Sequence, residues 1–451
     1  MLTSILIANR GEIARRINRT ARAMGVTTVA VYSEADAAAA YVLEADLAQA
    51  IGLAPPAQSY LNQDAIIAAA LATGAQAIHP GYGFLSENAA FARAVMAAGL
   101  VWVGPSPETI EAIGNKAAAR ELMEAAGMPV NPGARVASAR EAAQAAERLG
   151  MPVMVKAAAG GGGIGMKIVH DPAELWAVCE RTAAQAERLF GDGGLLVERY
   201  LEKARHVEIQ ILGLNDGRVV ILGDRDCSAQ RRFQKILEES PSPGVSAALR
   251  ERMYIAAAKA MTALRYRGVG TVECLVSKDD FVFLEVNARL QVEHPVTELT
   301  TGIDLVAEQL RVAAGDPPGF DPDAIARSGH AVEFRICAED PVRFFPSPGT
   351  IKRWVEPAGT GVRIDAGYRA GDEVTTFYDP LLAKLCAWGE DREMAMRRLG
   401  TAAEAFQIDG IKTNLPFLFR LLANSDFRRG SYDTGLVPSI QAQVNEPHRS
   451  A

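Results

Sequence analysis

The stretch EVNARLQVE, from Glu285 to Glu293, alternates strictly between polar and apolar side chains. Successive side chains of a β-strand point to opposite faces, so all five polar groups of this stretch can share one face. A strand with one solvated face would be expected to mix Lys, Thr and Ser among its polar residues, and the stretch contains none of them. The sequence therefore predicts a strand whose polar face carries chemistry.

This polar face combines oxygen donors with a cation and a carboxylate. Glu285 and Asn287 stand two residues apart, and Glu273 can join them from the neighbouring strand of a predicted hairpin. Carboxylate and amide oxygens suit a hard ion such as Mg²⁺, which commonly binds a few protein ligands together with nucleotide phosphates. Further along, Arg289 can clamp a small anion, and Glu293 is close enough in sequence to act as a base on that anion. The sequence shows no His/Cys cluster with the spacing of a zinc site.

A glycine run upstream indicates a bound nucleotide. The segment KAAAGGGGIGM, from Lys156 to Met166, contains the GxGxxG pattern, but a predicted strand follows it where a dinucleotide fingerprint needs a helix. A P-loop is excluded because no Gly-Lys-Ser/Thr ends the run. Glycines between two strands are typical of a hairpin flap whose bare amides close over phosphates, although a plain surface loop has the same composition. The lysine at its start favours the phosphate-binding interpretation.

Two further segments fit the same kind of site with less specificity. Residues His206 to Gln210 alternate like the first stretch and can line a nucleotide from the side. Residues 225–235 carry four cations within eleven positions, which suits a local phosphate-binding patch, while a solvated loop explains them equally well.

The remaining patterns divide the chain into an α/β part and α+β parts. Residues 4–32 read as strand, helix and strand, and this alternation continues to about residue 115, which predicts a parallel sheet. From 127 to 201, a smaller α+β module surrounds the glycine run. Turn signals at 215–217 and 278–280 then join strands of a mainly antiparallel sheet. A third region of short strands and helices follows.

Composition argues against nucleic acid and membrane partners. The formal net charge is −7 and the pI is about 5.6, which does not suit a chain whose main partner is a polyanion. The N-terminus becomes charged within ten residues, and no window has the length and apolar character of a membrane span. The five cysteines are scattered without a CxxC pair, as is typical of reduced thiols in a cytosol. We therefore expect a cytoplasmic protein.

Taken together, these segments resemble biotin carboxylase, the ATP-grasp subunit or domain of biotin-dependent carboxylases. The resemblance covers almost the whole chain. It is carried by the flap around Lys156 and by the segments IANRGEIA (7–14), HPGYGFLSEN (79–88), RHVEIQ (205–210), RDCSAQRR (225–232), FLEVNARLQVEHPVTE (283–298), VEFRICAEDP (332–341), SPGTI (347–351) and DGIKTN (409–414). Other ATP-grasp ligases share the flap and the metal strand but lack the EHPVTE and AEDP elements.

The resemblance implies a multidomain fold of the α/β and α+β classes. A Rossmann-like parallel α/β domain would occupy residues 1–115. An ATP-grasp domain would follow over 116–315, with a mobile glycine-rich lid at about 130–203. A biotin carboxylase C-terminal domain would span 328–440.

The resemblance also implies a set of site residues. ATP would be bound by Lys116, Lys156, Gly162, Gly163, Met166, Glu198, Leu201, His206, Gln230 and Leu275. Mg²⁺ or Mn²⁺ would be held by Glu273, Glu285 and Asn287. Bicarbonate and biotin would be surrounded by Lys235, Arg289, Gln291, Val292 and Arg335. Catalysis would use Glu293 as the base that prepares bicarbonate, with Lys235, Arg289 and Arg335 as the cations that stabilise charge.

The implied reaction begins when bicarbonate attacks the γ-phosphate of ATP and forms carboxyphosphate. Carboxyphosphate breaks down to CO₂ and phosphate, the phosphate takes the proton from biotin N1, and Arg335 stabilises the enolate-like biotin. The sequence contains no Ala-Met-Lys-Met biotinyl motif and is too short for a carboxyltransferase, so a separate biotin carboxyl carrier protein and carboxyltransferase subunits are expected as partners. The family further implies a homodimer within an acyl-CoA carboxylase, such as the acetyl-CoA carboxylase of fatty acid metabolism.

Two positions depart from the family pattern. Ile164 stands where the flap commonly has an arginine, and Phe233 stands where the basic loop often carries His or Asn. Neither position supplies a metal ligand or the base. These departures keep open a catalytically weak ATP-binding regulatory subunit. Another ATP-grasp carboxylate–amine ligase is the alternative among enzymes, and dependence on biotin distinguishes it.

Overall fold

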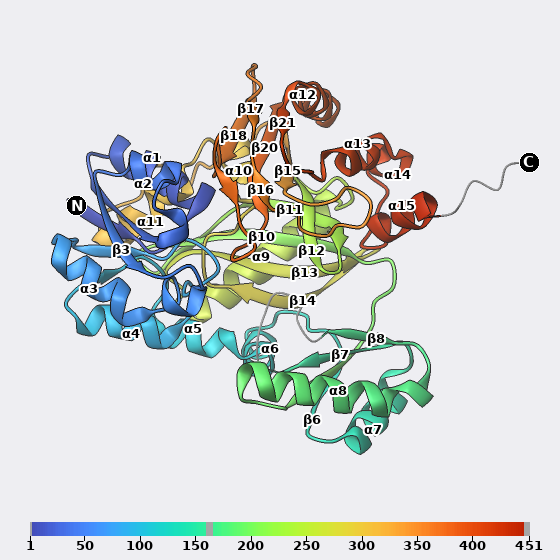
Figure 1. Ribbon diagram of the computed structural model, residues 1–451. Helices are drawn as coiled ribbons and strands as arrows, with labels where there is room; N and C mark the ends of the chain where they lie inside the picture. Colours follow the sequence, from blue (N-terminus) through green and yellow to red (C-terminus); the bar gives the residue numbers. More distant parts are fainter. Residues whose placement is uncertain (1, 159–165, 446–451) are drawn as a thin grey trace, which may run out of the picture.

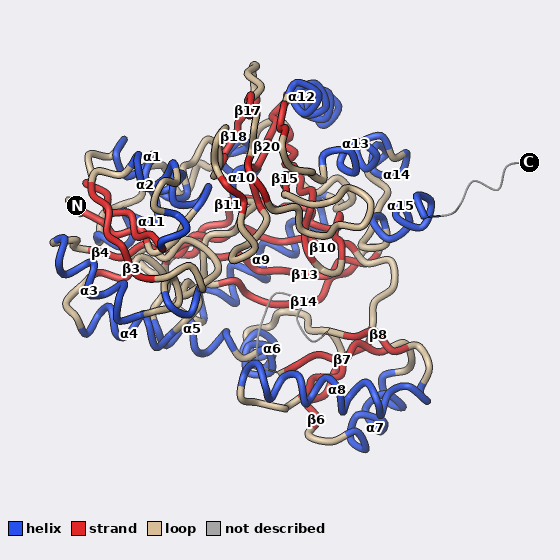
Figure 2. The backbone as a smooth tube through the Cα atoms, viewed as in Figure 1, coloured by secondary structure: helices blue, strands red, loops and turns tan. Residues whose placement is uncertain are grey.

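The computed structural model describes residues 2–158 and 166–445, and it shows a main body with a smaller lobe attached (Figure 1). The main body contains a parallel sheet and a large antiparallel sheet, with helices packed around both (Figure 2). The lobe holds a four-stranded sheet of its own. This architecture confirms the predicted combination of α/β and α+β parts. Among the described helices, none has the length and apolar character that crossing a membrane requires.

The N-terminal part is built on a five-stranded parallel sheet with strand order β3-β2-β1-β4-β5. The central strand, β1, is a short apolar run, as is typical of a parallel strand with both faces covered. Ile5 and Ile7 enter one hydrophobic core, and Leu6 between them enters another. The elements are β1 (Ser4–Ile7), α1 (Gly11–Ala23), β2 (Thr27–Ser33), α2 (Ala40–Glu44), β3 (Leu47–Gly52), α3 (Gln63–Thr73), β4 (Ala77–His79), α4 (Ala89–Ala97), β5 (Val101–Trp102) and α5 (Pro107–Gly114).

The smaller lobe contains the strands of the flap. Its antiparallel sheet has the order β6-β9-β7-β8, and two helices pack on it around a small apolar core. β7 and β8 pair in antiparallel register, with Val155 opposite Lys167, so the two predicted strands that flank the glycine run are confirmed. The loop itself, with Gly162, Gly163 and Ile164, lies outside the described residues. The elements are α6 (Lys116–Ala125), which leads into the lobe, then β6 (Gly133–Val136), α7 (Ala139–Leu149), β7 (Val153–Ala157), β8 (Lys167–Val169), α8 (Pro172–Phe190) and β9 (Leu195–Arg199).

An eight-stranded antiparallel sheet forms the centre of the main body, with the order β14-β13-β10-β11-β12-β15-β20-β18. Strands from the third predicted region extend this sheet, because β15 pairs with β12. The domain limits given above, at residues 1–115, 116–315 and 328–440, remain predictions. The strands are β10 (Arg205–Gly213), β11 (Val219–Arg231), β12 (Gln234–Ser240), β13 (Gly268–Ser277), β14 (Asp280–Asn287), β15 (His330–Cys337), β18 (Val362–Ala366) and β20 (Leu381–Gly389).

Helices and two small ribbons complete the main body. α10 and α12 pack against the large sheet, and the last helices lie near its β11 and β15 strands. The remaining elements are α9 (Ala247–Ala263), α10 (His294–Thr301), α11 (Leu305–Ala314), β16 (Gly349–Thr350), β17 (Arg353–Val355), β19 (Glu373–Val374), α12 (Arg392–Ala405), β21 (Gln407–Asp409), α13 (Leu415–Ala423), α14 (Ser425–Arg429) and α15 (Leu436–Asn445).

Glu239 on β12 connects the sheet to the C-terminal segments. Its Oε2 accepts a hydrogen bond from Arg392 Nε at 2.6 Å and lies 2.6 Å from His330 Nε2. Its Oε1 accepts from the Tyr432 hydroxyl at 2.6 Å. Burial alone would raise the pKa of Glu239, but His330 and Arg392 lower it to about 2. The carboxylate therefore holds four segments together as a buried anion.

We expect Glu239→Gln to lower the free energy of unfolding by about 3 kcal/mol at neutral pH, because removing one partner leaves buried cationic groups unpaired. The folded pKa of Glu239 lies below its ordinary value of 4.5, so the stabilisation is present above pH 4.5 and is lost as the pH falls toward 2. Urea unfolding of both proteins across this range measures the difference. The exposed Glu393→Gln is the control, and a difference that persists undiminished in acid would contradict the expectation.

Candidate active site

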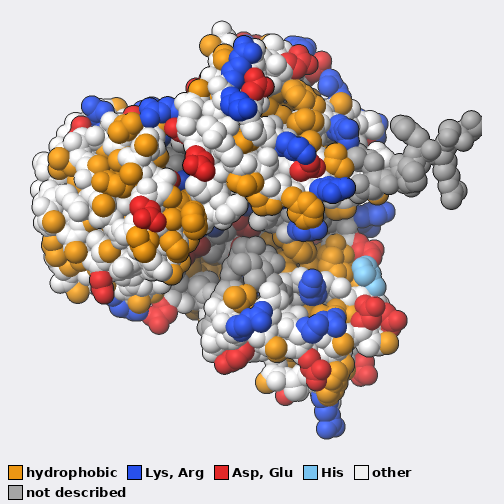
Figure 3. Space-filling view, in the orientation of Figure 1, with side chains coloured by type: hydrophobic (Ala, Val, Ile, Leu, Met, Phe, Trp, Pro, Cys, Tyr) orange, Lys and Arg blue, Asp and Glu red, His pale blue; other side chains and the backbone are white. Residues whose placement is uncertain are grey.

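A cavity of about 1170 Å³ opens between the lobe, the N-terminal part and the polar face of the large sheet. The space-filling view shows the surface hollowed between the lobe and the main body (Figure 3). Every predicted site residue that the structure describes lines this cavity, while Gly162 and Gly163 lie outside the described residues. These lining residues are Lys116, Lys156, Met166, Glu198, Leu201, His206, Gln230, Lys235, Glu273, Leu275, Glu285, Asn287, Arg289, Gln291, Val292, Glu293 and Arg335.

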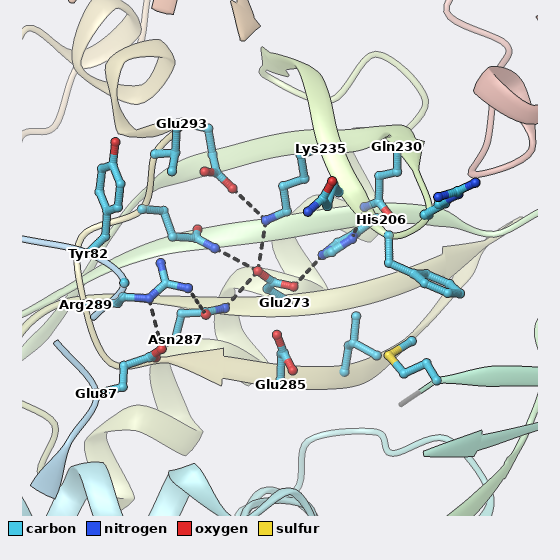
Figure 4. A pocket seen from close by; sticks show the side chains of 18 of the residues that line it. Tyr82, Glu87, His206, Gln230, Lys235, Glu273, Glu285, Asn287, Arg289 and Glu293 are labelled. Carbon is cyan, nitrogen blue, oxygen red and sulfur yellow. Dashed lines mark hydrogen bonds and ion pairs between the residues drawn. The ribbon is translucent and has the colours of Figure 1, made fainter. Parts of the chain in front are cut away.

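Lys235 places a cation among three carboxylates, of which Figure 4 labels Glu273 and Glu293. Its Nζ donates to Glu208 Oε2 at 2.6 Å, to Glu273 Oε1 at 3.0 Å and to Glu293 Oε1 at 2.6 Å. An ammonium has three donors, and here each donor has its own carboxylate. Burial alone would lower the pKa of Lys235, but the three carboxylates raise it well above its ordinary value. Lys235 is therefore a permanent positive charge in the wall of the cavity.

Glu293 is a buried carboxylate held between two cations. It stands at the start of α10, and only 2% of its surface is exposed. Oε1 accepts from Lys235, and Oε2 accepts from Arg335 at 2.9 Å. Burial alone would raise the pKa of Glu293, but Lys235 and Arg335 hold it well below its ordinary value. The carboxylate is therefore ionised at neutral pH, which is the state that a general base requires.

The predicted strand 285–293 is shorter than its alternation indicates. β14 ends at Asn287, and the chain then turns toward the N-terminal part and into α10. The amide of Ala288 leaves the sheet because it donates to Glu87 Oε1 at 3.1 Å. The interpretation of a single strand face is therefore wrong for the second half of the stretch, although Glu293 still reaches the same cavity as the first half.

The predicted metal ligands lie together on β13 and β14. Glu273 and Glu285 are directly opposite each other in the antiparallel register, and Asn287 Nδ2 donates to Glu273 Oε1 at 2.8 Å. Lys116 Nζ lies 3.6 Å from Glu285 Oε2. Carboxylates that face each other repel unless a cation lies between or beside them. Two carboxylates with an amide oxygen beside them form a donor set that fits Mg²⁺.

Arg289 is positioned by a residue that the sequence analysis missed. Its Nε donates to Glu87 Oε2 at 3.0 Å, and one of its terminal nitrogens donates to Asn287 Oδ1 at 2.8 Å (Figure 4). Glu87 belongs to the HPGYGFLSEN segment of the N-terminal part. That segment is recognisable as a motif, but its local pattern does not mark the glutamate as a partner of a distant arginine.

Residues 225–235 form the end of β11, the turn at 232–233 and the start of β12. Three of the four cations, Arg231, Arg232 and Lys235, line the cavity, whereas Arg225 is fully buried beneath it. Its guanidinium donates to Glu208 Oε1 at 2.5 Å and to Gln291 Oε1 at 2.6 Å. Both composition-based interpretations are therefore wrong for Arg225, because strand pairing turns its side chain inward.

The far side of the cavity from Arg289 suits an adenosine moiety (Figure 4). Lys156 Nζ lies 2.5 Å from Glu198 Oε2, and both side chains are buried. Gln230 Nε2 lies 2.5 Å from His206 Nδ1. Apolar wall is supplied there by Met166, Leu201 and Leu275. A mixture of apolar surface and a few polar groups is typical of nucleotide pockets.

Comparisons with known proteins agree with this site. Three family models match: Biotin carboxylase, N-terminal domain, over residues 1–110; Carbamoyl-phosphate synthase L chain, ATP binding domain, over 115–318; and Biotin carboxylase C-terminal domain, over 333–439. A biotin carboxylase of Halalkalibacterium halodurans is 50% identical over 440 residues, which cover 97% of each chain. A pyruvate carboxylase subunit of Methanothermobacter thermautotrophicus is 46% identical over 100% of this chain and 92% of its own.

The similarity to a solved structure extends to the backbone fold. The biotin carboxylase domain dimer of Hydrogenobacter thermophilus 2-oxoglutarate carboxylase matches with a TM-score of 0.95 and 42% identity, covering 98% of this chain and 99% of that one. The similarity is thus spread along the whole chain in both sequence and fold. The chain belongs to the biotin carboxylase family of ATP-grasp ligases.

Proposed function

We propose that the protein carboxylates biotin with ATP and bicarbonate, through carboxyphosphate. The observation that carries the proposal is Glu293, a buried and ionised carboxylate held between Lys235 and Arg335 in a cavity that also contains an oxygen donor set. A base that takes a proton from bicarbonate must be ionised, and neighbouring cations lower the energy of the charge that develops during phosphoryl transfer. The similar Hydrogenobacter domain was solved with MgADP and with bicarbonate, which are ligands of the same classes.

In this proposal, the nucleotide lies across the lobe and the large sheet. Its adenosine contacts the His206, Gln230 and Met166 side of the cavity, and its phosphates contact Lys116 and Lys156. The remaining proposed ATP contacts are Glu198, Leu201 and Leu275, with Gly162 and Gly163 still a prediction. Glu273, Glu285 and Asn287 would hold Mg²⁺ or Mn²⁺, which neutralises phosphate charge when it is bound.

Bicarbonate would lie against Arg289, Gln291 and Val292. Glu293 takes its proton, a bicarbonate oxygen attacks the γ-phosphorus, and ADP leaves as carboxyphosphate forms. Carboxyphosphate then gives CO₂ and phosphate, the phosphate takes the N1 proton of biotin, and N1 attacks CO₂. Arg335 stabilises the negative charge that develops on biotin.

We further propose the partners and the acceptor. Biotin would be presented on a separate biotin carboxyl carrier protein, the chain would form a homodimer, and carboxyltransferase subunits would pass the carboxyl group to an acyl-CoA such as acetyl-CoA. The similar Hydrogenobacter domain was solved as a dimer. Similar proteins are named for pyruvate and 2-oxoglutarate, so a 2-oxo acid is the competing acceptor. Reconstitution with a carrier and a carboxyltransferase, offered acetyl-CoA or pyruvate, decides between them. A cytoplasmic location stays a prediction.

The proposed reaction predicts a specific pattern of ADP release by the purified chain. With Mg-ATP and bicarbonate, free biotin is expected to raise the rate, and omission of bicarbonate or chelation of the metal is expected to abolish the biotin-dependent part. A rate that requires an amine or amino acid and ignores biotin would favour another carboxylate–amine ligase. Tight ATP binding without turnover, including in the presence of a carrier protein, would favour a regulatory subunit.

A further inference from the structure

Two fully buried glutamates lie behind Arg335. Glu238 on β12 and Glu333 on β15 are directly opposite each other in the antiparallel register, and neither has exposed surface. Side chains in such positions point to the same face of the sheet, with Cβ atoms about 4.5–5.5 Å apart. The two carboxyl groups are therefore neighbours in the interior of the protein.

Each carboxyl group has one oxygen that accepts a hydrogen bond and one that does not. Glu238 Oε1 accepts from Arg335 Nε at 2.5 Å, and Glu333 Oε2 accepts from the Cys386 thiol at 3.3 Å. Glu238 Oε2 and Glu333 Oε1 are buried and have no donor among the described residues. A buried ionised oxygen without a donor is unfavourable, and two ionised carboxylates on directly opposite positions of a sheet also repel. One proton between them would remove both penalties.

The surrounding cations are already engaged by other groups. Arg335 also donates to Glu293, on the side of α10. Lys235 is taken up by its three carboxylates, as described above. Lys384 on β20 is fully buried and faces the pair, but its Nζ lies 3.1 Å from Glu12 Oε2 and donates to the Val292 carbonyl at 3.0 Å. Charge balance thus favours one proton on the pair.

Electrostatics point in the same direction. Burial, followed by the charge of Glu238, raises the pKa of Glu333 well above its ordinary value. Burial likewise raises the pKa of Glu238 to about 7, even though Arg335 opposes the shift. Burial also raises the pKa of Cys386, so the thiol on β20 stays neutral. Two interacting carboxyl groups of this kind titrate as a pair, and the second proton is lost only well above the usual range for a carboxylic acid.

We propose that Glu238 and Glu333 share one proton and together act as positioning residues for Arg335. The inference rests on the proposed function, because Arg335 is the residue proposed to stabilise the charge on biotin. With the proton in place, Arg335 meets a single buried negative charge behind it and stays in contact with Glu293 at the cavity wall. Without the proton, a second negative charge would draw the guanidinium toward β12 and β15 and away from Glu293.

The proposal assigns different effects to the two amide substitutions. Glu333→Gln keeps that position neutral, and its amide nitrogen can donate to Glu238 Oε2, so Arg335 stays in place. Biotin-dependent turnover should then persist to higher pH than in the wild type. Glu238→Gln removes the carboxylate that holds Arg335 and is expected to lower kcat/KM for biotin by about tenfold at every pH, while KM for ATP is unchanged.

Infrared spectroscopy of the whole chain at neutral pH tests the shared proton without depending on turnover. The carbonyl stretch of a neutral carboxylic acid is expected in the wild type and should be lost in Glu333→Gln, which leaves Glu238 ionised beside Arg335. Glu239→Gln is the matched control. Glu239 is the buried residue next to Glu238 in the chain, but its carboxylate is ionised, so removing that carboxylate should leave the band intact. A wild type without this band, or a band that survives Glu333→Gln, would overturn the proposal even if biotin carboxylation is confirmed.

Thermal unfolding provides a second readout. Because the folded pKa of Glu333 is raised, its burial costs stability that grows as the pH rises above the ordinary value of 4.5. Glu333→Gln is therefore expected to unfold at a higher temperature than the wild type at about pH 8, by roughly 1–3 °C, with a smaller gain in mild acid. A variant less stable than the wild type at that pH would mean that Glu333 is a well-satisfied ion, and the proposal would be wrong.

Discussion

Glu293→Gln is expected to lower bicarbonate-dependent ADP release by about 10²- to 10⁴-fold, while ATP still binds. The amide oxygen of glutamine can accept a hydrogen bond from Lys235 or Arg335, so the shape of the site is largely kept. The amide cannot take a proton from bicarbonate, and it no longer balances the two cations. Steady-state rates at saturating ATP, together with calorimetric titration of ATP, separate the loss of chemistry from the loss of binding.

A neighbouring glutamate provides the matched control for this variant. Glu339 also lines the cavity and pairs with Arg231 at 2.9 Å, but it has no contact with Lys235 or Arg335 in the described structure. Glu339→Gln should change the rate by no more than a few-fold. If Glu293→Gln retained most of the wild-type rate under the same conditions, bicarbonate would have to lose its proton to another group.

The features that the sequence reveals depend on local periodicity. Glu273, Glu285 and Asn287 are grouped correctly in space because two adjacent strands of a hairpin bring alternate side chains to one face. The flap is recognisable for a similar reason, since the glycine run lies between two strands that pair with each other. Wherever one hairpin decides the geometry, the order of residues contains the necessary information.

The features that the sequence does not reveal depend on contacts between distant segments. The amide of Ala288 donates a hydrogen bond to Glu87 outside the strand, and the alternation of polar and apolar residues does not predict this contact. Arg225 resembles a surface cation in a basic segment, but strand pairing buries it beneath Gln291. The Glu238 and Glu333 pair arises because β12 and β15 pair across a long intervening stretch of chain. Register over such distances is set by packing of the whole domain.

Lys235→Met is expected to lower biotin-dependent turnover by about 10²- to 10³-fold, because it removes the cation that three carboxylates share. The variant also changes the base itself. Lys235 makes the largest contribution that opposes burial at Glu293, so its loss raises the pKa of Glu293. Since Glu293 acts in its ionised form, the acid limb of the pH–rate profile should move to higher pH. Residual rates measured from mild acid to mild alkali test this shift.

A second substitution distinguishes charge balance from simple damage. Glu208 is fully buried and contacts both Lys235 and Arg225, so Glu208→Gln removes one carboxylate from the cluster while keeping an acceptor for the arginine. In the double variant with Lys235→Met, the pKa of Glu293 should fall back and part of the activity should return. The exposed Lys412→Met should leave the profile unchanged. An acid limb that does not move in Lys235→Met would mean that Arg335 alone keeps Glu293 ionised, and the central role of Lys235 would then be limited to holding the carboxylates in place.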